Sequence, residues 1–272
     1  MHSSLSPRQT EELGISDASV RAIHEALDRP NLIDWDAEKA SAGGIYGFNS
    51  IDPRSRSFNL VRGRLLELKR HRGLRLIGVV SATPNVGKSF VSANISASLS
   101  RDPQLRTFAV DLDLRRGSLS TQFGLVTDHG LSDHLESGEP LQTFALAGEN
   151  LTLVPSRGGL VHSAELLSSS RARSLFKAMR ASDQRNLFIC DLPPVFANDD
   201  AVATMAYLDG YILVAEEGTT TEREIRDSVD ALGRERLAGV VLNKFKGGVL
   251  SDGYGVESYY AQGYGETRTR ER

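Results

Sequence analysis

The sequence lacks the features that mark secreted, membrane-spanning or nucleic-acid-binding proteins. Its 272 residues include one cysteine, Cys190, so no disulfide framework forms and a reducing compartment is expected. No apolar run approaches the ~18 residues of a membrane span, and the first residues lack the charged-then-apolar pattern of a signal peptide. The net charge of −3 gives no sign of a nucleic-acid partner. We therefore expect a cytoplasmic protein, unless a partner holds it at a membrane.

The order of apolar runs along the chain indicates the fold class. Runs such as 212–214 and 240–242 lack the polar alternation of a half-exposed strand, which is typical of a parallel sheet covered on both faces. Strands are predicted at 75–81, 106–111, 151–155, 187–191, 209–215 and 238–243. Helices are predicted at 57–71, 88–100, 130–137, 163–181, 199–207 and 221–233. The alternation predicts an α/β fold, a doubly wound and mostly parallel sheet with helices on both faces.

One stretch, residues 76–89, has the pattern of a phosphate-binding loop. An apolar run is followed by small residues and then by Gly87-Lys88-Ser89, and a segment with helical spacing comes next. In such a P-loop the backbone N–H groups and the helix dipole hold an anion, the lysine reaches the β- and γ-phosphates, and the serine hydroxyl binds Mg²⁺. A structural turn with an incidental lysine is the alternative, and it leaves two further acidic strand ends unexplained.

Those acidic strand ends carry Asp111, Asp113 and Asp191. Asp111 and Asp191 each follow an apolar run, and parallel strands end at the same edge of a sheet as the P-loop. Mg²⁺ bound to nucleotide phosphates takes one or two carboxylates together with waters, so Ser89, Asp111 and Asp191 are the candidate metal ligands. Asp113 lies two residues beyond Asp111, on the same side of an extended chain, and either carboxylate is a candidate acceptor of a proton. Turn-forming aspartates are the structural alternative.

Composition divides the chain into three parts. Residues 1–55 are polar and interrupted by Gly and Pro, and they are interpreted as a flexible N-terminal arm rather than a domain. Within the arm a short helix is expected over 18–27. The single tryptophan, Trp35, is expected to pack locally, with a docking patch as the alternative. Residues 56–245 form the P-loop domain, and the Gly- and Tyr-rich tail at 246–272 is expected to be mobile.

These motifs resemble those of the bacterial tyrosine kinases, or BY-kinases, which accompany exopolysaccharide and capsule synthesis. Residues 81–89 look like the family's Walker A motif, 110–116 like its Walker A′ and 189–195 like its Walker B; 164–169 and 239–244 also match. The resemblance covers about 58–265. It implies a P-loop kinase domain that transfers the γ-phosphoryl group of ATP, with Mg²⁺, to its own C-terminal tyrosine cluster. The phosphoacceptors implied are Tyr254, Tyr259, Tyr260 and Tyr264.

The resemblance also assigns roles to other residues. Lys88, Asp111 and Asp113 are the implied catalytic residues. The implied nucleotide-binding residues are Thr83, Pro84, Asn85, Val86, Gly87, Lys88, Ser89, Phe90 and Asn243, the last of which approaches adenine in the family. A separate transmembrane polysaccharide co-polymerase is the implied partner, and a homo-oligomer in which subunits phosphorylate one another is expected.

Three positions separate this chain from relatives or from the family pattern. Thr83 stands where the Min- and Par-type partition ATPases carry an extra lysine, which favours the kinase branch. Asn85 stands where the kinases have a glycine, and we expect it to adopt the left-handed backbone that Asn tolerates. The family's oligomer motif of Glu, Arg and Arg is here Arg56, Asn59 and Arg62. This departure leaves open a P-loop ATPase switch without kinase activity, and a scaffold that binds no nucleotide.

Overall fold

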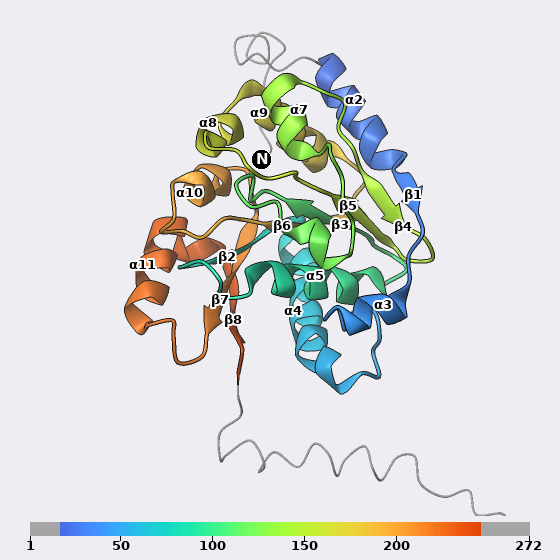
Figure 1. Cartoon of the computed structure of the whole chain (residues 1–272). Coiled ribbons are helices and arrows are strands. Elements are labelled where there is room, and N and C mark those ends of the chain that lie inside the picture. The colour runs from blue at the N-terminus through green and yellow to red at the C-terminus, as the bar shows by residue number, and fades with distance from the viewer. Residues whose placement is uncertain (1–16, 246–272) are drawn as a thin grey trace, which may run out of the picture.

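A single mixed sheet dominates the computed structural model, which describes residues 17–245 (Figure 1). In this part of the chain eight strands are arranged in the order β1-β4-β5-β3-β6-β2-β7-β8. The strands are β1 (Asn31–Ile33), β2 (Leu76–Ser81), β3 (Arg106–Asp111), β4 (Phe144–Leu146), β5 (Leu151–Val154), β6 (Asn186–Asp191), β7 (Gly210–Glu216) and β8 (Leu237–Asn243). Neighbouring strands run parallel except β4 and β5, which are antiparallel. The predicted mostly parallel sheet is confirmed.

Helices cover both faces of this sheet, because its central strands are apolar on both sides. In β2, Ile77 and Val79 belong to the cluster beneath α4 and α5, whereas Leu76 and Val80 belong to the cluster on the opposite face. The helices are α2 (Asp17–Asp28), α3 (Ala37–Ala42), α4 (Arg56–Arg72), α5 (Lys88–Ser100), α6 (Leu119–Gln122), α7 (Leu131–Ser137), α8 (Ser163–Leu167), α9 (Ser170–Ala181), α10 (Asp200–Met205) and α11 (Glu222–Leu232). Two short 3-10 helices, η1 (Pro53–Ser55) and η2 (Arg234–Arg236), complete the described elements. The doubly wound arrangement is confirmed.

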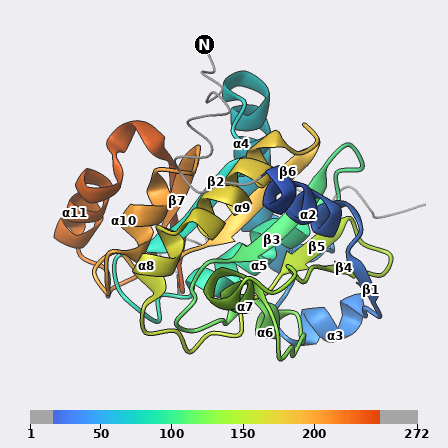
Figure 2. The same ribbon diagram turned by 90° about the horizontal axis from the view of Figure 1, so that it is seen from above.

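The N-terminal segment differs from the predicted flexible arm, since residues 17–55 are built into the domain. The expected helix is present as α2, and its apolar face, Val20, Ile23 and Leu27, is buried in the main core. Viewed from above, α2 lies beside α9 (Figure 2). Strand β1 then extends the sheet beside β4. The sequence analysis did not predict this packing, because the segment is polar in overall composition and only one face of α2 is apolar.

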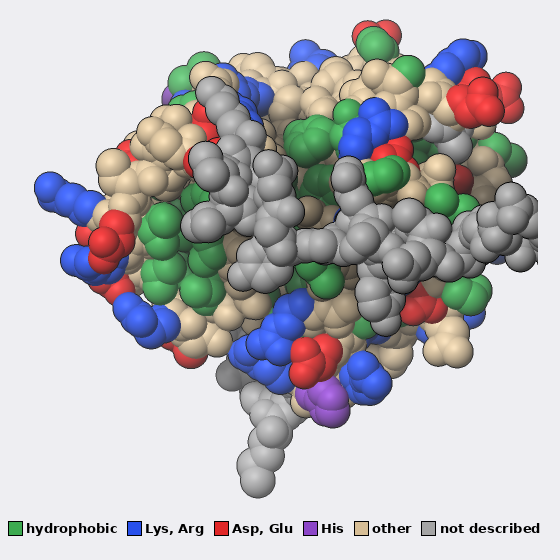
Figure 3. All heavy atoms as spheres, turned by 90° about the horizontal axis from the view of Figure 1, so that it is seen from below, with side chains coloured by type: hydrophobic (Ala, Val, Ile, Leu, Met, Phe, Trp, Pro, Cys, Tyr) green, Lys and Arg blue, Asp and Glu red, His purple; other side chains and the backbone are tan. Residues whose placement is uncertain are grey.

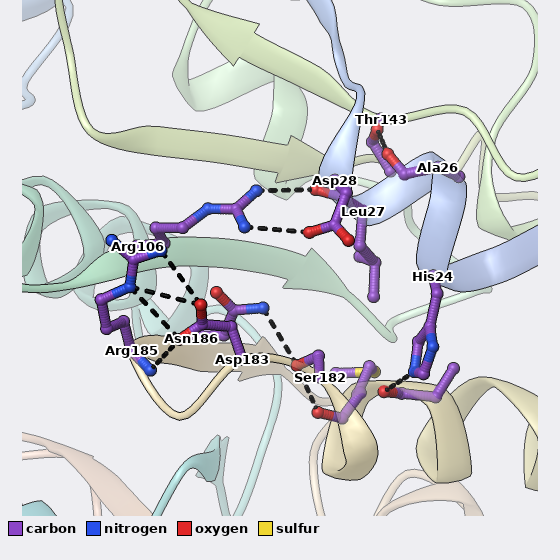
Figure 4. A network of polar contacts seen from close by, with 12 residues as sticks. His24, Ala26, Leu27, Asp28, Arg106, Thr143, Ser182, Asp183, Arg185 and Asn186 are labelled. Atoms are coloured by element: carbon purple, nitrogen blue, oxygen red, sulfur yellow. Dashed lines mark hydrogen bonds and ion pairs between the residues drawn. The ribbon is translucent and has the colours of Figure 1, made fainter. Parts of the chain in front are cut away.

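Polar contacts hold α2 in place (Figure 4). His24 Nε2 lies 2.7 Å from the carbonyl oxygen of Ala178 in α9. Arg106, at the start of β3, donates to Asp28 Oδ1 at 2.9 Å and to the Leu27 carbonyl at 3.2 Å. The C-terminal half of α2 is thus tied to α9 and β3.

Of the other predictions about local structure, one is wrong and others are confirmed. The helix predicted at 163–181 is two helices, because the Ser169 side chain accepts the Ala172 N–H and caps a new helix. Trp35 packs locally as predicted, against Phe48 and Phe123. Cys190 is buried in the core, and that burial raises the pKa of its thiol. The predicted tail at 246–272 lies outside the described residues.

The molecular surface carries its exposed apolar side chains in separate groups among charged ones, as the view from below shows (Figure 3). Among the described residues, Val240 and Leu242 on edge strand β8 and the following Phe245 are exposed. No described helix has both the length and the hydropathy of a membrane span.

The burial of α2 makes a direct prediction about stability. Replacing Ile23 with Ala leaves a cavity in the main core, so the free energy of unfolding should fall by roughly 2–5 kcal/mol. Leu32 is 75% exposed in the neighbouring β1, and Leu32→Ala should change the free energy by less than about 0.5 kcal/mol. Urea denaturation of the two variants measures both. Equal, small effects would show that α2 contributes nothing to the folded domain.

Candidate active site

The P-loop connects β2 to α5 through a tight turn. Two of its residues have a left-handed backbone: Asn85, with φ of 65°, and Gly87, with φ of 90°. The expectation that Asn85 would adopt this conformation is confirmed. The first N–H groups of α5 have no carbonyl one turn before them, so they are free to bind an anion. The turn therefore has the conformation that a phosphate cradle requires.

Side chains from two other elements hold the P-loop. Asn243, at the end of β8, donates from Nδ2 to the Val86 carbonyl at 2.8 Å, and a Cβ at Gly87 would collide with this amide. Lys244 Nζ contacts the Asn85 carbonyl at 2.8 Å, and Arg116 donates to Asn85 Oδ1 at 2.9 Å. In this structure Asn243 thus contacts the loop backbone.

Lys88 is buried between carboxylates. Its Nζ lies 3.2 Å from Asp191 Oδ1 and 3.4 Å from Asp113 Oδ2. Burial by itself lowers the pKa of Lys88, but the neighbouring carboxylates, Asp191 foremost, act in the opposite direction and raise it overall. Lys88 is therefore a fixed positive charge at the centre of the site.

Asp191 accepts hydrogen bonds from two serines of α5. Ser89 Oγ donates to Oδ2 at 2.6 Å and Ser92 Oγ to Oδ1 at 2.8 Å. Ser89 lies in addition 2.9 Å from the hydroxyl of Ser118. A serine that donates its proton to Asp191 keeps its oxygen lone pairs for a cation, as a metal-binding hydroxyl must.

Asp111 is tied to the backbone of its own loop and is fully buried. Oδ2 accepts the Leu119 N–H at 2.8 Å and Oδ1 the Asp113 N–H at 3.2 Å. Burial raises the pKa of Asp111 well above its usual value, and the nearby Asp191 carboxylate adds to the rise. Asp111 thus fixes the start of α6, which begins at Leu119.

The donor set fits a divalent cation shared with phosphates. Three buried carboxylates lie at this edge and the Lys88 ammonium contacts two of them, so an additional positive charge is favourable here. Among the described residues no three His, Cys, Asp or Glu side chains form a metal-holding group by themselves. Mg²⁺ bound to nucleotide phosphates does not require one, because phosphate and water oxygens complete its octahedron.

Some candidate residues lie elsewhere or have other contacts. Phe90 packs edge-on against Tyr46 and Phe58, on the α4 side of α5. The Thr83 carbonyl accepts a hydrogen bond from Ser81 within the loop. The four tail tyrosines lie outside the described residues.

Four residues of the site were assigned no role in the sequence analysis. Ser92 and Ser118 contribute hydroxyls. Arg116 and Lys244 are cations, and both contact Asn85. Ser92 was detectable, since it follows Ser89 by three residues and so lies on the same helix face. The other contacts depend on how separate loops meet.

Comparison with known proteins agrees with this geometry. The model of the family "CobQ/CobB/MinD/ParA nucleotide binding domain" matches residues 77–257. The chain is 29% identical over 254 residues to tyrosine-protein kinase etk of Escherichia coli strain K12, covering 87% of this chain and 34% of that protein. It is 32% identical over 179 residues to tyrosine-protein kinase ptk of Acinetobacter johnsonii, covering 65% of this chain and 23% of that protein.

A solved structure is similar over most of the chain. The kinase domain of Escherichia coli tyrosine kinase ETK matches with a TM-score of 0.64 and 25% identity, covering 90% of this chain and 98% of that domain. The chain thus spans about a third or less of the curated relatives but nearly all of an isolated kinase domain. Its P-loop and strand-end carboxylates lie within the matched family segment, and the chain therefore belongs to the CobQ/CobB/MinD/ParA family of nucleotide-binding domains.

Proposed function

We propose that the chain is a protein-tyrosine autokinase, which transfers the γ-phosphoryl group of ATP to its own C-terminal tyrosines. The observation that carries the proposal is the position of Lys88, held at the P-loop between the carboxylates of two other strand ends. Relatives named as tyrosine-protein kinases support the choice of acceptor. Tyr254, Tyr259, Tyr260 and Tyr264 supply phenols in the same chain.

Lys88 and the P-loop amides hold the phosphates in this proposal. When ATP is present, the Lys88 ammonium exchanges part of its contact with the carboxylates for the β- and γ-phosphate oxygens, and it stabilises charge on the transferred group. Ser89, Asp111 and Asp191 are the proposed Mg²⁺ site, with Asp191 acting through the Ser89 hydroxyl that it orients. Mg²⁺ supplies charge neutralisation between the phosphates. Asn243 is proposed to border the adenine.

Asp113 is the better placed of the two candidate bases. Both Asp111 oxygens accept backbone N–H groups, and burial raises the pKa of Asp111. Asp113 accepts the Arg116 N–H through one oxygen, and its other oxygen contacts the Lys88 ammonium. In the transfer, the bond from the γ-phosphorus to the β-phosphate oxygen breaks and a bond to the phenol oxygen forms. The phenol proton passes to Asp113, and the leaving group is ADP.

The proposed cellular role is supported by the kind of relative. One relative is described as a putative tyrosine-protein kinase in the cps region of Klebsiella pneumoniae. We propose that this chain regulates exopolysaccharide synthesis or export from the cytoplasmic face of the membrane. Its proposed partner is a transmembrane polysaccharide co-polymerase, and trans-phosphorylation calls for a homo-oligomer.

A second candidate is a P-loop ATPase switch of a membrane assembly, without kinase activity. It is favoured by the oligomer motif position Asn59, which is hydrogen-bonded to Arg101 of the same chain. An intramolecular partner at this position supports a different assembly from that of the kinases.

Phosphate mapping decides between these functions. After incubation with Mg-ATP, intact-mass and peptide mass spectrometry should find phosphate on one or more of the four tail tyrosines. Lys88→Met should abolish the labelling, because the charge that holds the phosphates is lost. ATP turnover by a chain whose mass stays unchanged, even with a membrane-adaptor fragment present, would favour the ATPase switch instead.

Ser92 and Ser96 provide a matched pair for testing the role of Asp191. Both are buried on α5 and contact the carbonyl four residues earlier, but only Ser92 also bonds to Asp191. A hydrogen bond to a charged group contributes ~1.5–3 kcal/mol, so Ser92→Ala should weaken Mg-ATP binding on the order of tenfold. Ser96→Ala should leave binding nearly unchanged. Calorimetric titration measures both, and equal affinities in the two variants would contradict the proposed arrangement.

A further inference from the structure

A cavity of about 450 Å³ lies away from the P-loop, between the segment that follows β1 and the end of α6. One wall contains Asp34, Trp35, Asp36 and Lys39, and the other is the stretch 121–124. The buried Trp35 Nε1–H has no acceptor among the described residues. Buried donors are nearly always paired, so the Trp35 N–H requires an acceptor, which a backbone carbonyl of a docked segment can supply.

The wall beside β1 is acidic and extended. Asp34 makes no ion pair or hydrogen bond within the described part of the chain. Asp36 forms an ion pair with Lys39, with 3.5 Å between Asp36 Oδ2 and Lys39 Nζ. Two carboxylates facing one ammonium leave a net charge of −1 on this wall. Asp36 has extended backbone angles, and Asp34, Trp35 and Asp36 all line the cavity. The strand before them, β1, is an edge of the sheet with one free side.

The opposite wall is coupled to the candidate active site. Helix α6 begins at Leu119, whose N–H binds Asp111, and the preceding Ser118 hydroxyl contacts Ser89. The same helix ends at Gln122, which lines the cavity. A segment bound in the cavity therefore touches the short helix that positions Asp111.

The chain contains a segment of complementary charge and spacing. Residues 266–272 read Glu-Thr-Arg-Thr-Arg-Glu-Arg, with Arg268, Arg270 and Arg272 two residues apart. In an extended strand these three guanidinium groups share one face, with the same repeat as Asp34 and Asp36. Arginine binds carboxylates through paired N–H donors and stacks on aromatic rings such as that of Trp35.

The segment can reach the cavity from its own chain. Strands β8 and β1 lie at opposite edges of the sheet (Figure 1), a separation of roughly 34 Å at ~4.8 Å per strand. The 20 residues from 246 to 265 span up to roughly 66 Å when extended.

We propose that the arginine segment at 266–272 docks intramolecularly along the free side of β1, with its guanidinium groups on Asp34 and Asp36 over the Trp35 cavity. The docked segment contacts α6 and thereby acts on the position of Asp111. If the tail tyrosines are phosphorylated, a step that rests on the proposed function, their negative charges oppose docking against this acidic wall and release the segment.

Trp35 is the only tryptophan in the chain, so its fluorescence reports on this cavity directly. The experiment uses the full chain without nucleotide, so its result does not depend on whether the chain is a kinase. The triple variant Arg268→Gln/Arg270→Gln/Arg272→Gln should shift Trp35 emission to longer wavelength and raise its quenching by acrylamide. High salt should produce the same shift in the unmodified chain and little change in the triple variant, because salt screens exposed ion pairs.

Two controls make the outcome specific. A triple variant with equal charge loss on the far side of the domain, Arg223→Gln/Arg226→Gln/Arg234→Gln, should leave Trp35 fluorescence unchanged. Asp34→Asn leaves the α3 cap on Asp36 intact and should reproduce the effect of the first triple variant, with no further change when the two are combined. Thermal unfolding checks that each variant is folded.

Two results would overturn the proposal. One is identical Trp35 emission and quenching in the unmodified chain and the arginine variant at all salt concentrations. The other is a signal that grows with protein concentration, because that would assign the docked segment to a second copy of the chain.

Discussion

The contact between the buried Lys88 ammonium and the carboxylates of Asp113 and Asp191, at two other strand ends, is the constraint on which the site depends. Parallel packing of β2, β3 and β6 brings Asp111, Asp191 and the P-loop to one edge regardless of charge. Burying three carboxylates beside a single cation is unfavourable unless donors or further positive charge compensate. The loops provide donors from three backbone N–H groups, and α5 provides two serine hydroxyls. The remaining negative charge suits a metal bound together with phosphates.

The same constraint explains why distant segments converge on the P-loop. Its left-handed turn at Asn85 is braced from β8 by Lys244 and from the loop after β3 by Arg116. The α6 helix is anchored on Asp111 at one end and borders the Trp35 cavity at the other. Through these contacts the N-terminal segment, which the sequence assigns to a flexible arm, becomes a neighbour of the candidate active site.

The parts of this architecture that were predictable have strong local signals. Continuous apolar runs identify the central strands, and the Gly-Lys-Ser element with its following helix identifies the P-loop. Strands β1 and β4 were missed because three residues are too few to show a period, and β1 is largely exposed. The break at Ser169 lies within a sequence of helical character and depends on a single side-chain cap. Arg116 and Lys244 were missed because their contacts arise only when separate loops meet.

The most direct test of the central claim is the thermal stability of the unmodified chain with ATP, in the presence of Mg²⁺ and in EDTA. A ligand at 100 times its Kd stabilises the folded state by about 2.7 kcal/mol, which raises the melting temperature measurably. A site with excess buried carboxylate around Lys88 predicts a clear rise with Mg-ATP, a much smaller one with ATP in EDTA, and no rise in Lys88→Met. An unchanged melting temperature under all these conditions would contradict a nucleotide site at this edge of the sheet.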